Sequence, residues 1–183
     1  MAKLHDDIED DLREWIGKQQ MFFVATAPLS GDGHVNCSPK GTDSFRVLGP
    51  KQVGYLDYTG SGAETIAHIR ENGRIVFMFC AFEGAPKILR LHGKARFVTP
   101  DSGEWDQLRR QFPEATGVRS IILADISRVC DSCGFAVPKY EFIEQRGILQ
   151  EWSDKTGEAG VTEYQQKKNL VSIDGLTALD RKP

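Results

Sequence analysis

Long apolar runs and clusters of basic residues are both missing from this sequence. No stretch approaches the roughly 20 apolar residues that a membrane-spanning helix needs. The N-terminal segment is acidic and lacks the basic-then-apolar order of a secretion signal. The formal net charge is -3, and the basic residues are scattered, which argues against binding to nucleic acid or to an anionic membrane. We therefore expect a cytoplasmic protein.

The linear signatures of several enzyme classes are absent as well. GxSxG, HExxH, a P-loop and a GxGxxG following a strand do not occur. No pair of carboxylates is distinctive enough to predict glycosidase chemistry. No two of the four histidines have the spacing of metal ligands; they are His5, His34, His68 and His92. The sequence therefore predicts no metal site, and it assigns no catalytic side chain.

Cysteine is scarce, with four residues in the chain. Two of them, Cys130 and Cys133, form a CxxC motif, but a zinc site would need a second pair. Gly134 and Pro138 follow too closely for the helix that a thioredoxin-like motif requires. We interpret the motif as an incidental pair in a turn, with a reversible disulfide as the alternative.

The remaining pattern is that of short strands with a few helices. At 183 residues the chain has the length of one domain, which we expect to span residues 1–183. Helical spacing of apolar residues predicts an N-terminal helix over 4–17, and a C-terminal extension over 138–183 contains a helix near 163–169. Apolar or alternating runs bounded by turn residues predict strands over 21–27, 34–38, 45–48, 53–58, 74–80, 89–97 and 118–129.

Two short helices are expected between these strands. Ser61 precedes Glu64 by three residues, which is the spacing of a capping box, and Asn72-Gly73 supplies a stop. Thr99-Pro100 is typical of an N-cap and first helical residue. Strands interrupted by short helices, without βαβ regularity, favour a mainly β fold with flanking helices. The prediction is an antiparallel Greek-key barrel, closed or split.

Two segments have the composition of a ligand site. Residues 36–41 carry a hydroxyl and a cation, Ser38 and Lys40, into a turn that contains Pro39 and Gly41. Residues 57–64 bring hydroxyls and glycine-rich backbone to a helix N-terminus, where anions bind readily. Arg90, on the polar face of its strand, is a further candidate for contact with a phosphate or an electron-rich ring.

The order of these segments resembles the pyridoxamine 5′-phosphate oxidase-like superfamily of FMN-binding split barrels. The resemblance covers about residues 12–129, and it depends on the order and spacing of loose motifs. These are Phe22 to Ala27, Ser38-Pro39-Lys40-Gly41 before Phe45-Arg46-Val47-Leu48, Tyr58-Thr59-Gly60-Ser61, the helix end Ile66 to Gly73, the strand Arg74 to Phe79, and Ile88-Leu89-Arg90-Leu91-His92-Gly93. The tail Ser172-Ile173-Asp174-Gly175-Leu176 is similar to that of an uncharacterised subgroup.

The resemblance implies a homodimer with FMN at the subunit interface, in which the flavin carries out the redox step. By position, Ser38, Pro39, Lys40 and Gly41 line the flavin. The ribityl and phosphate portion is held by Asp57, Tyr58, Thr59 and Ser61, together with Thr65. Arg90 lies on the later strand that approaches the cofactor. The implied function is an FMN-dependent oxidoreductase that acts on an unidentified small molecule.

The sequence also departs from that family. Val35 stands where true pyridoxamine-phosphate oxidases have an arginine, and Ser61-Gly62-Ala63 replaces their Ser-Arg-Lys run. The tail lacks the Arg-x-His pair that holds the substrate's phosphate, which argues against pyridoxamine phosphate as substrate. The alternatives are a reductase that uses the deazaflavin F420, a flavin or haem carrier without turnover, and a barrel that binds nothing.

Overall fold

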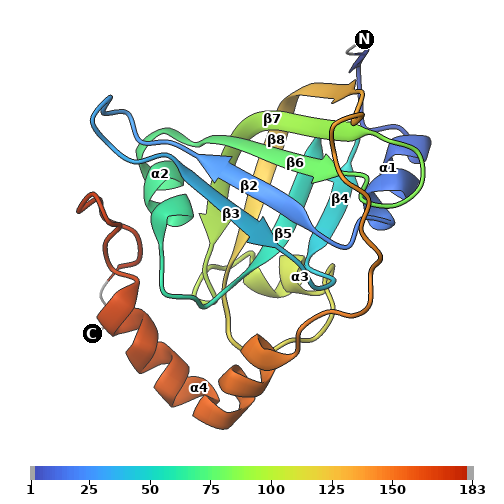
Figure 1. Cartoon of the computed structure of the whole chain (residues 1–183). Helices are drawn as coiled ribbons and strands as arrows, with labels where there is room; N and C mark the ends of the chain where they lie inside the picture. The colour runs from blue at the N-terminus through green and yellow to red at the C-terminus, as the bar shows by residue number, and fades with distance from the viewer. Residues whose placement is uncertain (1–2, 181–183) are drawn as a thin grey trace.

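Residues 3–180 of the chain are described by a computed structural model, shown in Figure 1. An eight-stranded sheet has the order β3-β2-β6-β7-β8-β5-β4, with β1 paired to β8, and all these pairs are antiparallel. The elements are β1 (Lys3–His5), α1 (Asp10–Gly17), β2 (Phe22–Thr26), β3 (Asn36–Lys40), β4 (Phe45–Gly49), β5 (Gln52–Tyr58), α2 (Glu64–Asn72), β6 (Arg74–Cys80), β7 (Ile88–Val98), α3 (Trp105–Arg109), β8 (Val118–Ser132) and α4 (Ile148–Lys168).

The sheet curls into a barrel whose two ends, β3 and β4, leave a split between them (Figure 1). The predicted mainly β fold with flanking helices, a split barrel, is confirmed. Strand alternation directs one face of each strand inward: Leu89 and Leu91 of β7 are fully buried. The centre of the core is a group of aromatic rings in mutual contact, Phe22, Phe45, Tyr55, Phe77 and Phe79.

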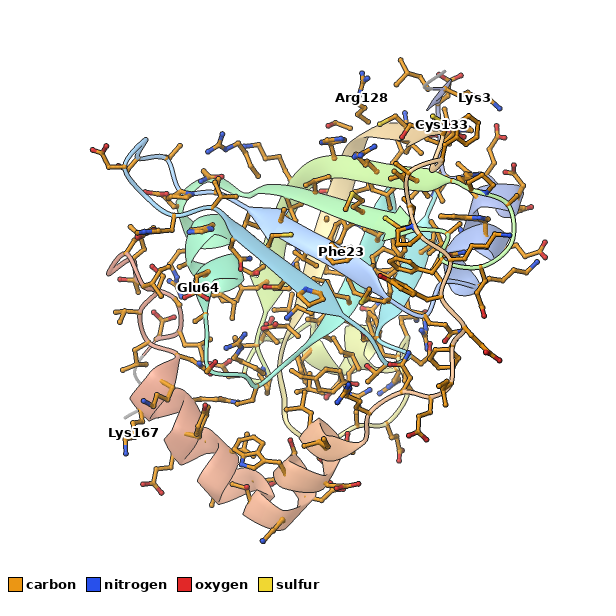
Figure 2. The ribbon with its side chains drawn as sticks, viewed as in Figure 1. Lys3, Phe23, Glu64, Arg128, Cys133 and Lys167 are labelled. Carbon is orange, nitrogen blue, oxygen red and sulfur yellow. The ribbon has the colours of Figure 1, made fainter. Side chains whose placement is uncertain are left out.

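The two ends of the chain differ from the sequence prediction. The N-terminal helix covers residues 10–17, not 4–17, because residues 3–5 form β1 and pair with the far end of β8. Lys3 accordingly lies at the same end of the molecule as Cys133 (Figure 2). The C-terminal helix α4 runs from 148 to 168, far longer than the predicted 163–169, with a break at Gly157. Its break places Trp152 against Tyr164, with ring centroids 5.2 Å apart.

Three local predictions between the strands were wrong. Ala63, not Ser61, is the N-cap of α2, and the Glu64 carboxylate accepts from the backbone N–H of Ile173 in the tail instead of closing a capping box.

Thr99-Pro100 belongs to a turn, and α3 starts only at Trp105. Strand β3 continues through Pro39 to Lys40, because an end strand tolerates a proline that cannot donate to a neighbour.

The CxxC motif also differs from the interpretation as a turn. Cys130 lies within β8, where it pairs with Leu4 and Arg90, and Cys133 follows the end of the strand. Both thiols are free, and Cys133 is exposed. Within residues 3–180, no helix is both long and apolar enough to cross a membrane.

Polar contacts help to attach helix α4 to the barrel. Gln165 Nε2 donates to Thr59 Oγ1 at 2.8 Å, and Asn169 Nδ2 donates to the Gly60 carbonyl at 2.9 Å. On the other half of the helix, Ser153 packs directly over Gly117. The C-terminal extension therefore holds the loop that follows β5, a segment that the sequence singled out for ligand binding.

A substitution at Gly117 tests this attachment of α4 to the barrel. Its φ of 70° lies in the left-handed region, and a Cβ there would overlap the Ser153 side chain. We expect Gly117→Ala to lower the free energy of unfolding by about 1–3 kcal/mol, since both the backbone and the contact with α4 would be strained. Urea denaturation measures the change. Gly103→Ala is the control, because Gly103 has open space around it and no positive φ; equal losses in the two variants would contradict the proposed packing.

Candidate functional site

One face of the end strand β3 carries polar side chains toward the split of the barrel. Alternation places Asn36, Ser38 and Lys40 on this face, where they are half-buried, while Cys37 and Pro39 are exposed on the other. On the opposite side, β4 pairs only with residues 52–55 of β5, and the end of β5 borders the split beyond it. Here Asp57 follows buried apolar residues, and its own side chain is fully buried.

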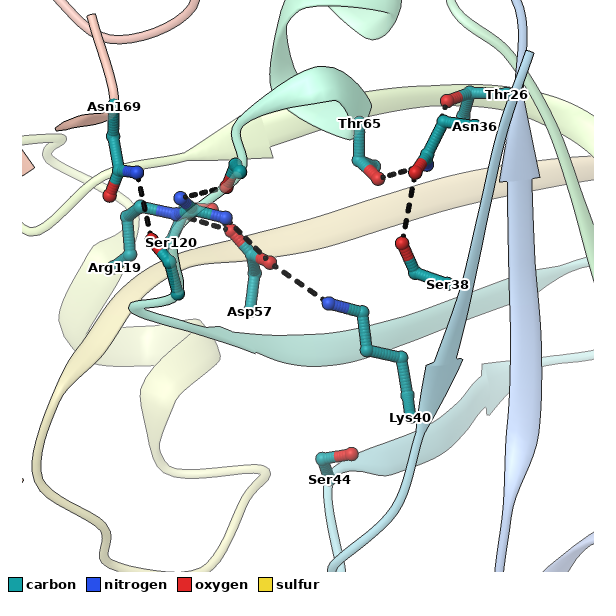
Figure 3. A network of polar contacts seen from close by, with 12 residues as sticks. Thr26, Asn36, Ser38, Lys40, Ser44, Asp57, Thr65, Arg119, Ser120 and Asn169 are labelled. Carbon is teal, nitrogen blue, oxygen red and sulfur yellow. Dashed lines mark hydrogen bonds and ion pairs between the residues drawn. The ribbon is translucent and has the colours of Figure 1, made fainter. Parts of the chain in front are cut away.

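Lys40 and Asp57 connect the two sides of the split. The Lys40 Nζ lies 3.7 Å from Asp57 Oδ1, as Figure 3 shows. Arg119 of β8 donates two hydrogen bonds to the same carboxylate, from Nε at 2.9 Å and from Nη2 at 3.2 Å. Ser120 Oγ donates a third to it at 3.0 Å. Arg119 Nη1 also donates to the Gly62 carbonyl at 2.8 Å, which ties the loop before α2 to the same cluster.

The charges in this cluster depend on one another. Burial alone would raise the pKa of the Asp57 carboxyl, but Arg119, Lys40 and the hydrogen bonds from Arg119 and Ser120 overcome burial and hold that pKa below its ordinary value. Burial likewise opposes the charge on Arg119, yet the Asp57 carboxylate raises the pKa of the guanidinium. A buried carboxylate is thus kept ionised between two cations.

A fully buried phenol lies beside this ion cluster. Burial, and then the charge of Asp57, raise the pKa of Tyr55 well above its ordinary value, so its hydroxyl keeps its proton. The Lys40 Nζ stands 5.9 Å above the centroid of the Tyr55 ring. The ring therefore forms part of the floor under the lysine.

A second polar network runs from the same face of β3 into the protein. Ser38 Oγ donates to Asn36 Oδ1 at 2.9 Å, and Asn36 Nδ2 donates to Thr65 Oγ1 at 3.0 Å and to Thr26 Oγ1 at 3.3 Å (Figure 3). Thr26 Oγ1 in turn contacts His68 Nδ1 at 2.9 Å. Burial, the main effect, lowers the pKa of His68 and favours its neutral form. This network orients the Ser38 hydroxyl and the first turn of α2.

Together these groups border a cavity of about 130 Å³ at the split. One wall is the inner face of β3, and another is the N-terminus of α2, which has no side-chain cap for its free backbone N–H groups. The lining residues are Asn36, Ser38, Lys40, Tyr58, Gly60, Gly62, Glu64, Thr65 and Arg119. Hydroxyls, an amide, two cations and a helix N-terminus make a set of donors for a polar, anionic ligand.

The structure brings only some of the predicted site residues to this cavity. Ser38, Lys40, Tyr58 and Thr65 line it, and Asp57 lies behind it as the anion of the buried cluster. The others point elsewhere or lie outside the lining: Pro39 is exposed on the outer face of β3, Gly41 follows the strand, Thr59 is bonded to α4, Ser61 is exposed, and Arg90 lies on the outer face of β7, where it donates to Ser132 Oγ.

Arg119 is the main residue that the sequence analysis missed. It stands at the start of β8, in the stretch 119–124 of that strand, which is entirely buried. A charged residue in such a strand needs an ionic partner. Asp57 in β5 is also a charged residue in a buried strand, so the sequence could have predicted that Arg119 and Asp57 form an ion pair. Within the part of the chain that the structure describes, no three His, Cys, Asp or Glu side chains gather as metal ligands do.

Comparison with known proteins gives the family of this chain. The sequence pattern of the family described as pyridoxamine 5′-phosphate oxidase matches residues 8–130. Over 203 residues the chain is 38% identical to ustO of Aspergillus flavus, a pyridoxamine 5′-phosphate oxidase family protein, covering 98% of this chain and 78% of that one.

Two solved structures have the same fold. A point variant of HupZ from Group A Streptococcus is 24% identical with a TM-score of 0.52, over 68% of this chain and 99% of that one. A candidate pyridoxamine 5′-phosphate oxidase of Lactobacillus delbrueckii is 18% identical with a TM-score of 0.51, over 69% and 98%. The sequence match extends over most of the barrel and the fold agrees with it: the chain belongs to the pyridoxamine 5′-phosphate oxidase family.

Proposed function

We propose that the protein is an FMN-dependent oxidoreductase that acts on a small molecule as a homodimer. The observation that carries this proposal is the donor set at the split of the barrel, in which Lys40, Ser38 and Thr65 border one cavity beside the N-terminus of α2. Family membership supports the choice of FMN among ligands with a phosphate and a polar chain. A cytoplasmic location and a single domain over residues 1–183 remain part of the same proposal.

The residues present fit the polar part of FMN. Lys40 and the free N–H groups of α2 can bind phosphate, while Ser38 and Thr65 can bond to hydroxyls. Gly60 and Gly62 line the cavity without side chains, so that backbone can approach a ligand closely. Glu64 is the one anion in the lining, and the tail N–H of Ile173 bonds to its Oε1.

When bound, FMN supplies the reversible uptake of electrons, and the protein's own residues hold and polarise it. The Lys40 ammonium provides a positive charge at the open side of the cavity, with its side chain 25% exposed. Asp57 fixes the position of that ammonium, and Arg119 keeps Asp57 ionised. Tyr55 closes the floor against water. No acid–base residue is assigned to the reaction.

A second copy of the chain is proposed because one copy offers too little enclosure. The cavity of about 130 Å³ is well below the roughly 300–1,000 Å³ of pockets that bury a ligand of this size. Arg90, which the sequence analysis assigned to the cofactor, lies on the outer face of its own barrel. We infer that it acts on the site of the second copy.

The absorption spectrum of the purified protein tests the proposed function. We expect the two visible bands of a flavin, either as isolated or after incubation with FMN and removal of the excess. Bleaching of these bands by a nicotinamide or other electron donor, with recovery in air, would support turnover. A haem band would instead favour the carrier. A featureless spectrum after incubation with FMN and with F420 would contradict flavin chemistry altogether.

A further inference from the structure

A second and larger cavity, of about 660 Å³, lies between α4 and one end of the barrel. Its volume falls within the roughly 300–1,000 Å³ that is usual for pockets of small organic ligands. It is distinct from the cavity at the split, since Arg119 is the one residue that lines both. Neither the family match nor the proposed flavin chemistry assigns it a role.

Two glycines allow the chain to enclose this space. Gly157, with a φ of 71°, breaks α4 so that the helix bends around the cavity. Gly117 admits Ser153 at van der Waals contact and thereby holds the first half of the helix against the barrel. In Figure 1 helix α4 lies below the barrel, and its first half is the part nearer to α3. The cavity is therefore a product of the C-terminal extension.

Apolar side chains form part of the cavity wall, alongside polar ones. The barrel contributes Phe97 and Val118, α3 contributes the ring of Trp105, and α4 contributes Val161. The aromatic and aliphatic surface suits the carbon skeleton of a small organic molecule. Trp105 is half-buried, and the face of an indole ring attracts a cation.

The polar groups give the cavity a preference for one sign of charge. Among residues 3–180, the two cations that line it are already engaged: Arg119 pairs with Asp57, and Arg109 donates to the carbonyls of Phe112, Pro113 and Ala115. Four acidic residues line the cavity, Asp101, Asp154, Glu158 and Asp180. Asp180 is paired with Arg70, but the carboxylates of Asp154 and Glu158 on α4 have no cationic partner within residues 3–180.

We propose that this cavity binds an organic ammonium compound with an apolar body. The body would pack on Val118 and Val161, and the ammonium group would lie between the carboxylates of α4 and the Trp105 ring. The site requires neither FMN nor a second copy of the chain. It can therefore be tested independently of the proposed redox function.

The direct test compares two probes of similar shape and opposite charge on FMN-free protein. Phenethylamine carries an ammonium group, and 3-phenylpropionate carries a carboxylate. By calorimetry at low salt, we expect phenethylamine to bind about tenfold more tightly or better, because like charges repel the carboxylate from α4. Equal affinities, tighter binding of 3-phenylpropionate, or no binding of phenethylamine would overturn the proposal.

Variants on α4 and α3 locate the binding. Asp154→Asn combined with Glu158→Gln should weaken phenethylamine binding about 2- to 30-fold, and Trp105→Leu should weaken it by a similar factor of about 2- to 30-fold. Both α4 positions are exposed, so the double variant should fold. Glu163→Gln is the matched control, an exposed acid on the same helix outside the cavity. If the control and the double variant bind phenethylamine alike, the assignment to this cavity is wrong.

Discussion

Replacing Asp57 with alanine is expected to lower the free energy of unfolding by about 3–5 kcal/mol. The carboxylate is fully buried, and its removal would leave the Arg119 guanidinium, 5% exposed, without an anion in the interior. The Ser120 hydroxyl would lose its acceptor as well. Urea denaturation monitored by tryptophan fluorescence measures the change.

An exposed ion pair of the same chemistry serves as the control. Arg96 holds Glu104 with two nitrogens, at 2.5 Å and 2.8 Å, but both side chains are about half exposed to solvent. Glu104→Gln should cost less than about 1 kcal/mol, because water screens the pair. A double variant, Asp57→Leu with Arg119→Met, should recover part of the stability lost by Asp57→Ala. If Asp57→Ala costs no more than Glu104→Gln, burial does not have the effect assigned to it.

The same carboxylate predicts how stability depends on pH. Its pKa in the folded protein lies below the value of about 3.9 that an aspartate has in an unfolded chain. As the pH falls past that unfolded value, the unfolded chain takes up the proton first and is stabilised. The stabilisation by Asp57 is therefore complete at neutral pH and is lost on acidification through the folded pKa. The difference in stability between the wild type and Asp57→Ala should narrow below about pH 4.

The barrel was predictable because its signals are local. Strict alternation in 89–97 corresponds to β7, and the glycine after Asn72 ends α2 in the left-handed conformation. Short apolar runs correspond to β2, β5 and β6. Each of these signals can be recognised from a few neighbouring residues alone. The strand of residues 3–5 could not be found in this way, since three residues form a strand only when a distant strand offers an unpaired edge.

Helix α4 shows the opposite case. Its sequence contains Gly157 and Gly160 and few apolar residues, so helical periodicity is weak over most of its length. It is held by Gln165, Asn169 and Ser153, whose contacts with the barrel join residues far apart in sequence. Polar docking of this kind leaves no periodic pattern that a sequence analysis could detect.

The site was predictable only in part, because its segments have local signals but their contacts do not. Lys40 and Asp57 were each singled out within their own segments, yet their contact depends on the curl of the sheet, which brings β3 opposite β5. Arg119 joins them from 62 residues beyond Asp57. Alternation in the sequence places Arg90 on the polar face of its strand, and the structure agrees: Leu89 and Leu91 are inward, so the residue between them faces outward.

Lys40→Met is expected to weaken FMN binding about 10- to 150-fold, the loss that follows from removing a hydrogen bond to a charged group. Among the described residues that line the cavity, Lys40 carries the one cation that is partly open to solvent, since Arg119 is buried and engaged on both sides. Methionine preserves most of the length of the side chain and its contact with the Tyr55 ring. Titration of flavin fluorescence measures the affinity.

The control for this variant is Lys51→Met, on an exposed lysine between β4 and β5 that pairs with Asp7. Loss of Lys40 leaves Asp57 bonded to Arg119 and Ser120, so its cost in stability should be far smaller than that of Asp57→Ala. A fall in affinity without a comparable fall in stability would separate a ligand contact from a structural one. If both lysine variants bind FMN as the wild type does, the cofactor is held by other groups. The protein could then still bind FMN and be yellow. The phosphate would in that case be held by the N-terminus of α2 and the loop that contains Gly60 and Gly62, and not by the charge of Lys40.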